Sequence, residues 1–106
     1  MAIIIKDTNN SSDKDIDIFL TAENFEDTMN GLIGVYYRLF AKESKKPLST
    51  RDQEKVKQFF FNYEKFIGIK RAISLTDWVA MDATIQQYNQ ELKEMVALEL
   101  SKYATI

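Results

Sequence analysis

Three stretches of the sequence repeat apolar residues every three or four positions, and this spacing limits the fold more than any other feature. The stripes run over residues 25–40, 56–67 and 78–103. A period of 3.6 residues places such side chains on one face of a helix. The sequence therefore predicts three amphipathic helices that bury their stripes against one another.

We expect the first helix over 21–46, because Thr21 suits an N-cap and Pro47 stops a helix. Gly31 and Gly34 lie inside this helix, where glycine costs stability. They indicate close packing of another helix, with a bend in the helix as the alternative.

We expect the second helix over 50–67, with Thr50 at the start of a capping box and Gly68 just past the end. The third helix is predicted over 75–103, after an N-cap at Ser74. Its apolar seam is too short for a coiled coil, so a bundle within one chain is the better interpretation.

Residues 1–20 predict a two-stranded β-ribbon. Ala2–Ile5 is rich in isoleucine, Asp15–Ile18 alternates polar and apolar residues, and turn-forming residues lie between them. The predicted fold class is therefore α+β, mainly helical, with the ribbon followed by a three-helix bundle in one domain over 1–106. The alternative is an all-α three-helix bundle with an extended N-terminal arm.

The composition argues against an enzyme, because the sequence contains neither cysteine nor histidine. Thiolate nucleophiles, the usual metal ligands and the usual general base are therefore missing. Asp13, Asp15 and Asp17 lack the glycine and glutamate of a calcium loop, and we interpret them as a solvated strand face. A ribbon and three packed helices leave little volume for a cleft of about 300 Å³. We expect no catalytic residue, cofactor, metal or small-molecule substrate.

Charge is divided along the chain. Two lysines face seven acids over 1–30, ten basic residues face four acids over 31–75, and two lysines face five acids over 76–106, for net charges of −5, +6 and −3. The basic side chains around the predicted first turn are candidates for contacts with phosphate or with an acidic protein surface. They are Arg38, Lys42, Lys45, Lys46, Arg51 and Lys55.

Phe61 is the unusual residue of the second helix. Steps of 100° per residue place it opposite the apolar stripe, between Lys57 and Lys65. Either the N-terminal ribbon covers Phe61, or Phe61 binds a partner together with Lys57, Lys65 and Tyr37, since aromatic and basic residues are common in interfaces.

These features predict a small non-catalytic protein-interaction module that acts as an inhibitor, adaptor, regulator or assembly factor. Small accessory proteins of phages and mobile elements often have this profile. One alternative is a nucleic-acid-binding regulator that uses the basic segment 38–71. Another is a self-assembling component, or homo-oligomer, that uses Met1–Ile5 as an edge strand together with the seam of the third helix. The apolar runs are too short for a signal peptide or a membrane span, so we expect a soluble cytoplasmic protein that does not bind membranes.

Overall fold

The computed structural model describes the backbone of residues 2–104 and the side chains of residues 17–104. Its helices are α1 (Ala2–Ser44), α2 (Gln53–Ala72) and α3 (Trp78–Leu98), and a short π-helix, η1 (Glu99–Tyr103), continues α3. The three helices predicted from the apolar stripes are confirmed, and an all-helical bundle fits the structure.

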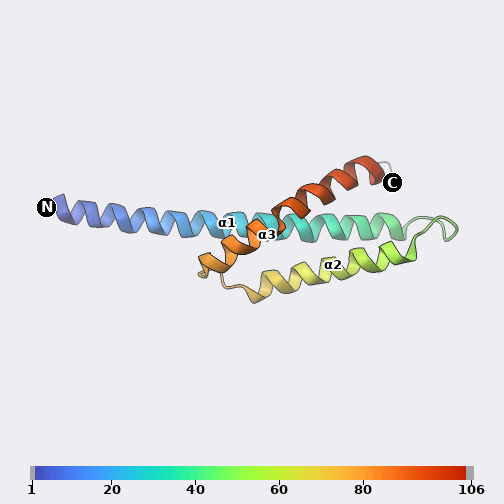
Figure 1. Ribbon diagram of the computed structural model, residues 1–106, viewed down its shortest axis with the longest axis horizontal. Helices are drawn as coiled ribbons and strands as arrows, with labels where there is room; N and C mark the ends of the chain where they lie inside the picture. The colour runs from blue at the N-terminus through green and yellow to red at the C-terminus, as the bar shows by residue number, and fades with distance from the viewer. Residues whose placement is uncertain (1, 105–106) are drawn as a thin grey trace.

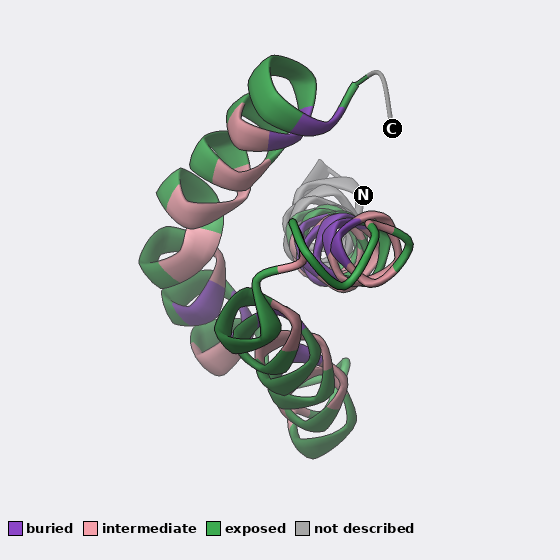
Figure 2. Ribbon diagram, turned by 90° about the vertical axis from the view of Figure 1, so that its right-hand side faces the viewer, coloured by how far each residue is buried: buried purple, intermediate pink, exposed green. Residues whose placement is uncertain are grey.

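The long helix α1 is the axis on which the other helices pack. Figure 1 shows α2 folding back along α1, while α3 crosses α1 from another side. Seen along the long axis, α2 and α3 cover different sides of α1 and leave a third side open (Figure 2). The molecule measures 74 × 25 × 17 Å, because the 43 residues of α1, about 64 Å long, extend past the other helices.

The β-ribbon predicted for residues 1–20 is not confirmed. Residues 2–20 belong to α1, the described backbone contains no strand, and residue 1 lies outside it. The alternation at Asp15–Ile18 covers only four residues, which is too short to separate a strand from one turn of helix. Helical propagation from the amphipathic part of α1 continues through this segment. The fitting alternative is the all-helical bundle, with a helical arm.

The predicted N-cap of the first helix is wrong because α1 begins earlier. The Thr21 hydroxyl donates to the backbone oxygen of Asp17 at 2.9 Å, the bond of a threonine inside a helix. At the other end α1 stops at Ser44, before Pro47, as the sequence predicted.

The second and third helices begin at aspartates. Thr50 is not the N-cap of α2, because its N–H and its hydroxyl both donate to the Pro47 carbonyl. The Asp52 carboxylate accepts from the first-turn N–H groups instead. Asp77, and not Ser74, caps α3 by accepting from the backbone N–H of Ala80 at 3.1 Å.

The core lies where the three helices meet, and most of its side chains come from α1. Its buried apolar members are Phe25, Met29, Leu32, Val35, Tyr36, Leu39, Phe59, Phe66, Met81 and Tyr103. α2 continues past Gly68 to Ala72, so Gly68 does not end the helix, and Ile69 and Ile73 pack against the core. Almost all of these positions belong to the predicted stripes.

Gly31 marks the close approach of α3 to α1. A Cβ atom at this position would lie 3.0 Å from Cδ1 of Leu92. Close packing therefore explains this glycine, in agreement with the first of the two interpretations. At Gly34 a Cβ would meet only the side chain of Arg38 in the same helix.

Candidate protein-interaction surface

Aromatic side chains join α1 and α2 along the side of their interface that faces away from α3. The rings of Phe40 and Phe60 lie 5.1 Å apart, and those of Tyr37 and Tyr63 lie 5.4 Å apart. The residue number rises along α1 from Tyr37 to Phe40 and falls along α2 from Tyr63 to Phe60, as expected for two antiparallel helices. We call this surface the α1–α2 seam, and it consists of Ile33, Tyr37, Phe40, Phe60, Tyr63 and Ile67.

The seam is open to solvent. Tyr37 is 52% exposed and Phe60 is 39% exposed, whereas Phe40 and Tyr63 are half-buried. An exposed cluster of large aromatic side chains is typical of interaction sites, because soluble monomers rarely leave such groups together in water. The seam therefore presents apolar area that the described residues of this chain do not cover.

A basic hollow lies at the end of the seam. Its volume is about 370 Å³, and Asn30, Ile33, Ile67, Lys70 and Arg71 line it. The Lys70 ammonium donates to the Asn30 side-chain oxygen at 2.8 Å. The sequence predicted little room for a cleft of about 300 Å³, and this hollow exceeds that volume. Its described lining combines apolar and basic groups, so it suits an apolar partner that carries a negative charge.

The structure separates the four predicted partner-binding residues. Phe61 is 67% exposed on the side of α2 that faces away from α1, and Lys57 is exposed there too. Tyr37 belongs to the seam instead. The Lys65 ammonium lies over the rings of Phe66 and Tyr88, at 5.1 and 5.2 Å from their centroids. The described residues leave Phe61 exposed, so they do not form the predicted covering layer, and Phe61 lies apart from the seam.

Four of the six predicted basic residues are paired with acceptors of the same chain. Arg38 and Lys42 both bind the Glu99 carboxylate, at 2.8 and 3.1 Å. Lys46 pairs with Glu43 at 3.1 Å, and Arg51 donates two hydrogen bonds to the backbone oxygen of Lys46. Lys45 and Lys55 are exposed. The six residues therefore do not form one free basic patch.

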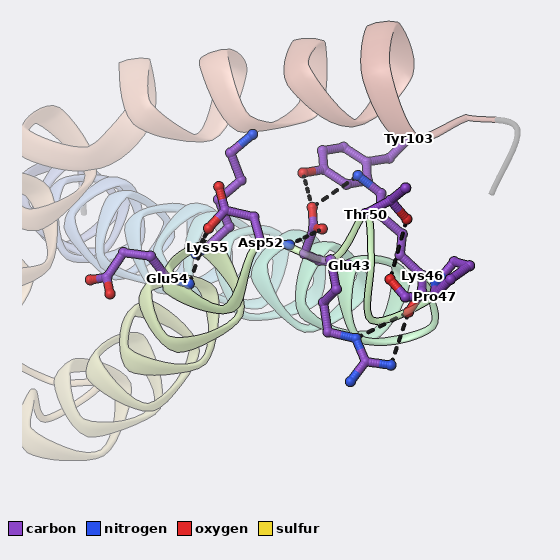
Figure 3. A network of polar contacts seen from close by, with 9 residues as sticks. Glu43, Lys46, Pro47, Thr50, Asp52, Glu54, Lys55 and Tyr103 are labelled. Carbon is purple, nitrogen blue, oxygen red and sulfur yellow. Dashed lines mark hydrogen bonds and ion pairs between the residues drawn. The ribbon is translucent and has the colours of Figure 1, made fainter.

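Glu43 is the buried centre of a polar network that closes the α1–α2 turn (Figure 3). Its carboxylate accepts from the Tyr103 hydroxyl at 2.7 Å, from the Asp52 N–H at 3.0 Å and from the Lys46 ammonium at 3.1 Å. Burial alone raises the pKa of Glu43, but these three donors outweigh it and the pKa lies below its ordinary value. Burial, with the bond to Glu43, raises the pKa of Tyr103 to about 12.

Two further carboxylates bind α3 and η1 to α1. Hydrogen bonds from the Arg38 guanidinium lower the pKa of Glu99, burial opposes this, and Lys42 lowers it further. The Tyr36 hydroxyl donates to Glu91 at 2.6 Å, and burial together with this bond raises the pKa of Tyr36. Each of these polar groups has its hydrogen-bond partner within the chain, and these bonds hold α3 and η1 against α1.

A second hollow of about 270 Å³ lies where α1 leaves the bundle. Asp17, Ile18, Thr21 and Trp78 line it. Phe19, next to Ile18 in α1, and Val79, next to Trp78 in α3, are both exposed. This end of the bundle therefore also exposes apolar side chains.

The sequence identified Tyr37 but missed the other residues of the seam. Phe40, Phe60 and Tyr63 were assigned to buried stripes, because helical periodicity gives the direction of a side chain but not the width of the partner that covers it. One signal was present: α2 has aromatic residues at 59, 60, 61, 63 and 66, more than a single covered face can bury.

Comparisons with known proteins give no family: no protein-family model, no curated protein sequence and no solved structure matches the chain. In the part of the chain that the structure describes, no helix has the length and apolar character needed to cross a membrane. The described residues also contain no group of three or more aspartate or glutamate side chains arranged to hold a metal ion.

Proposed function

We propose that this chain is a non-catalytic protein-interaction module that binds a helical segment of a partner along the α1–α2 seam. The observation that carries this proposal is the solvent-exposed row of aromatic residues between α1 and α2. Aromatic residues supply much of the binding energy in protein interfaces. The protein acts, in this proposal, by occupying the surface of another macromolecule.

The dimensions of the seam favour a helix as the bound element. From Asn30 in the basic hollow to Phe40 in the seam, the surface follows α1 for about 15 Å, or roughly three helical turns. An amphipathic helix that enters a groove presents apolar anchors over a similar length. Lys70 and Arg71 at one end favour a partner with a carboxylate near the corresponding end of its apolar face.

Composition supports the non-catalytic part of the proposal. The chain has no histidine and no cysteine. The tyrosines and buried glutamates with shifted pKa values hold helices together, since each pairs with another side chain of the chain. Shifted groups of this kind also occur in structural networks.

The test compares two charged variants at exposed aromatic positions. Tyr37→Asp places a charge on the seam, and Phe61→Asp places one on the outer face of α2. Each tagged protein is used for affinity capture from the cells that produce it, with quantitative mass spectrometry. We expect proteins retained by wild type and by Phe61→Asp to be lost at least tenfold with Tyr37→Asp, as for an interface anchor.

Circular dichroism of each variant is the folding control, and we expect both to keep the helical signal of wild type. Equal retention by all three proteins contradicts the proposal. Loss with Phe61→Asp alone assigns binding to Phe61 and Lys57, the separate site on the outer face of α2.

A further inference from the structure

The exposed face of α1 that carries Tyr37 continues along the helix beyond the end of α2. Phe19 and Tyr37 are separated by 18 residues, which is five turns of an α-helix, so both side chains lie on the same face of α1. Phe19 is 61% exposed. α2 lies beside the Tyr37 half of this face and ends at Ala72. Near the Phe19 half, the start of α3 approaches another side of α1, at Ile18 and Thr21, and Phe19 stays exposed.

Charge is also divided along this face. Glu26 lies on it, between Phe19 and the seam. Lys70 and Arg71, at the end of the seam, make no salt bridge among the described side chains. One half of the face is therefore aromatic and acidic, and the other half is aromatic and basic.

We propose that the seam binds a second copy of this chain, whose α1 lies antiparallel across the first. In this arrangement Phe19 of each copy packs on Tyr37 and Tyr63 of the other. Glu26 of each copy faces Lys70 and Arg71 of the other. The inference rests on the proposed function, because it names the occupant of the same seam.

The pairing is consistent with two-fold symmetry. If residue 19 of one α1 faces residue 37 of the other, residue 26 faces residue 30, the position at which Lys70 binds Asn30. An isologous interface uses the same patch on both subunits, and here each copy supplies both halves. The charges at residues 26, 70 and 71 then fix the register of the two helices.

The other helices leave room for this pairing. α2 lies beside only one half of the shared face, so antiparallel α1 helices bring the two α2 helices end to end and not side by side. α3 covers a different side of α1, away from the open side (Figure 2). The overlap from Phe19 to Tyr37 is about 27 Å of helix.

The first experiment measures molar mass by light scattering over a range of concentrations. We expect wild type to rise from 12.3 kDa toward twice that mass. Phe19→Asp weakens the dimer roughly thirtyfold, as expected for an aromatic anchor, while Phe61→Asp leaves it unchanged. A dimer that is insensitive to Phe19→Asp uses another face and overturns the inference.

Charge reversal tests the register. Glu26→Lys alone, or Lys70→Glu with Arg71→Glu, weakens the dimer about tenfold, because like charges then face each other. Combining all three substitutions restores most of the affinity. Loss without restoration overturns the antiparallel register.

The absence of cysteine permits a covalent test. A variant with Phe19→Cys and Tyr37→Cys has its two thiols about 27 Å apart on one rigid helix, so a disulfide between them must join two molecules. We expect mild oxidation to give a covalent dimer, whereas Phe61→Cys remains largely monomeric. Equal cross-linking of both variants overturns the proposal.

The outcomes separate the two proposals. A wild-type protein that stays at 12.3 kDa at every concentration overturns the dimer. If the wild-type protein stays monomeric but captures another protein that Tyr37→Asp does not capture, the seam remains a protein-binding site. If neither self-association nor capture depends on Tyr37, both proposals fail.

Discussion

The side of α1 that faces α3 and the core, the closed side, and the side that carries the seam, the open side, have similar aromatic residues but differ in exposure. Toward α3 and the core, Tyr36 stacks on Phe66, and its hydroxyl is bonded to Glu91. Toward the seam the neighbouring Tyr37 also contacts aromatic rings, but half of its surface stays in water. Aromatic content therefore does not distinguish the core from an exposed surface.

Polar partners distinguish the two sides more clearly. On the closed side the carboxylates of Glu43 and Glu99 each hold several donors of the same chain. On the seam, Arg71 has no salt bridge among the described residues. The polar groups of the closed side are paired within the chain, whereas apolar area and positive charge stay exposed at the seam.

The largest expected difference between the two sides concerns stability. Leu39→Ala removes a fully buried side chain of the closed side and should cost about 2 to 5 kcal/mol of unfolding free energy. Tyr37→Ala on the seam should cost less than about 1 kcal/mol. Urea unfolding of both variants measures this, and similar losses would show that the seam belongs to the core.

The buried network should show the next largest effect. Glu43→Ala leaves the donors from Tyr103, Asp52 and Lys46 without their acceptor and should cost about 2 to 4 kcal/mol. Tyr103→Phe removes only one of these bonds and should cost about 1 kcal/mol. A Glu43→Ala protein as stable as wild type would contradict the role of this network in closing the α1–α2 turn.

Stability should fall at both ends of the pH range. The lowered pKa values of Glu43 and Glu99 give stability that is present above pH 4.5 and is lost as the pH falls through the folded-state values. The raised pKa of Tyr103 gives stability that is present below pH 10 and is lost as the pH rises toward 12.

Thermal unfolding across pH measures these losses, and Tyr103→Phe should reduce the alkaline one, to which the raised pKa of Tyr36 also contributes. The same scan with Tyr37→Phe is the control from the seam. An unchanged alkaline profile in Tyr103→Phe would contradict the assignment.

The smallest expected effect compares two glycines. Gly68→Ala should stabilise α2 by about 0.5 to 1 kcal/mol, because the position is helical and nothing lies within 4 Å of the new Cβ. Gly31→Ala should gain less or lose stability, because its Cβ would press on Leu92. A larger gain at Gly31 than at Gly68 would contradict the close contact of α1 with α3.

The sequence predicted the three helices and most of the core because both depend on local periodicity. The β-ribbon predicted for residues 1–20 is not confirmed, because four alternating residues are too few to separate a strand from a turn of helix and residues 2–20 continue α1. The sequence prediction failed for the basic cluster, since Arg38 and Lys42 meet Glu99 from a distant part of the chain, and no local pattern shows that pairing. The exposure of Phe60 likewise depends on how α2 sits on α1.

The π-helix η1, which follows α3, determines how a one-residue insertion or deletion near the end of this helix would affect the packing. A π-helical turn resembles an α-helix that has gained one residue, and such a gain rotates the next residues of the helix by about 100°. Here the wider winding begins at Glu99, and Tyr103 at its end reaches Glu43. Deleting one residue within this stretch swings the tyrosine away from α1 while Trp78–Leu98 keeps its register. The π-helical stretch therefore sets the direction of Tyr103 alone, and the contacts of Trp78–Leu98 with α1 do not depend on it.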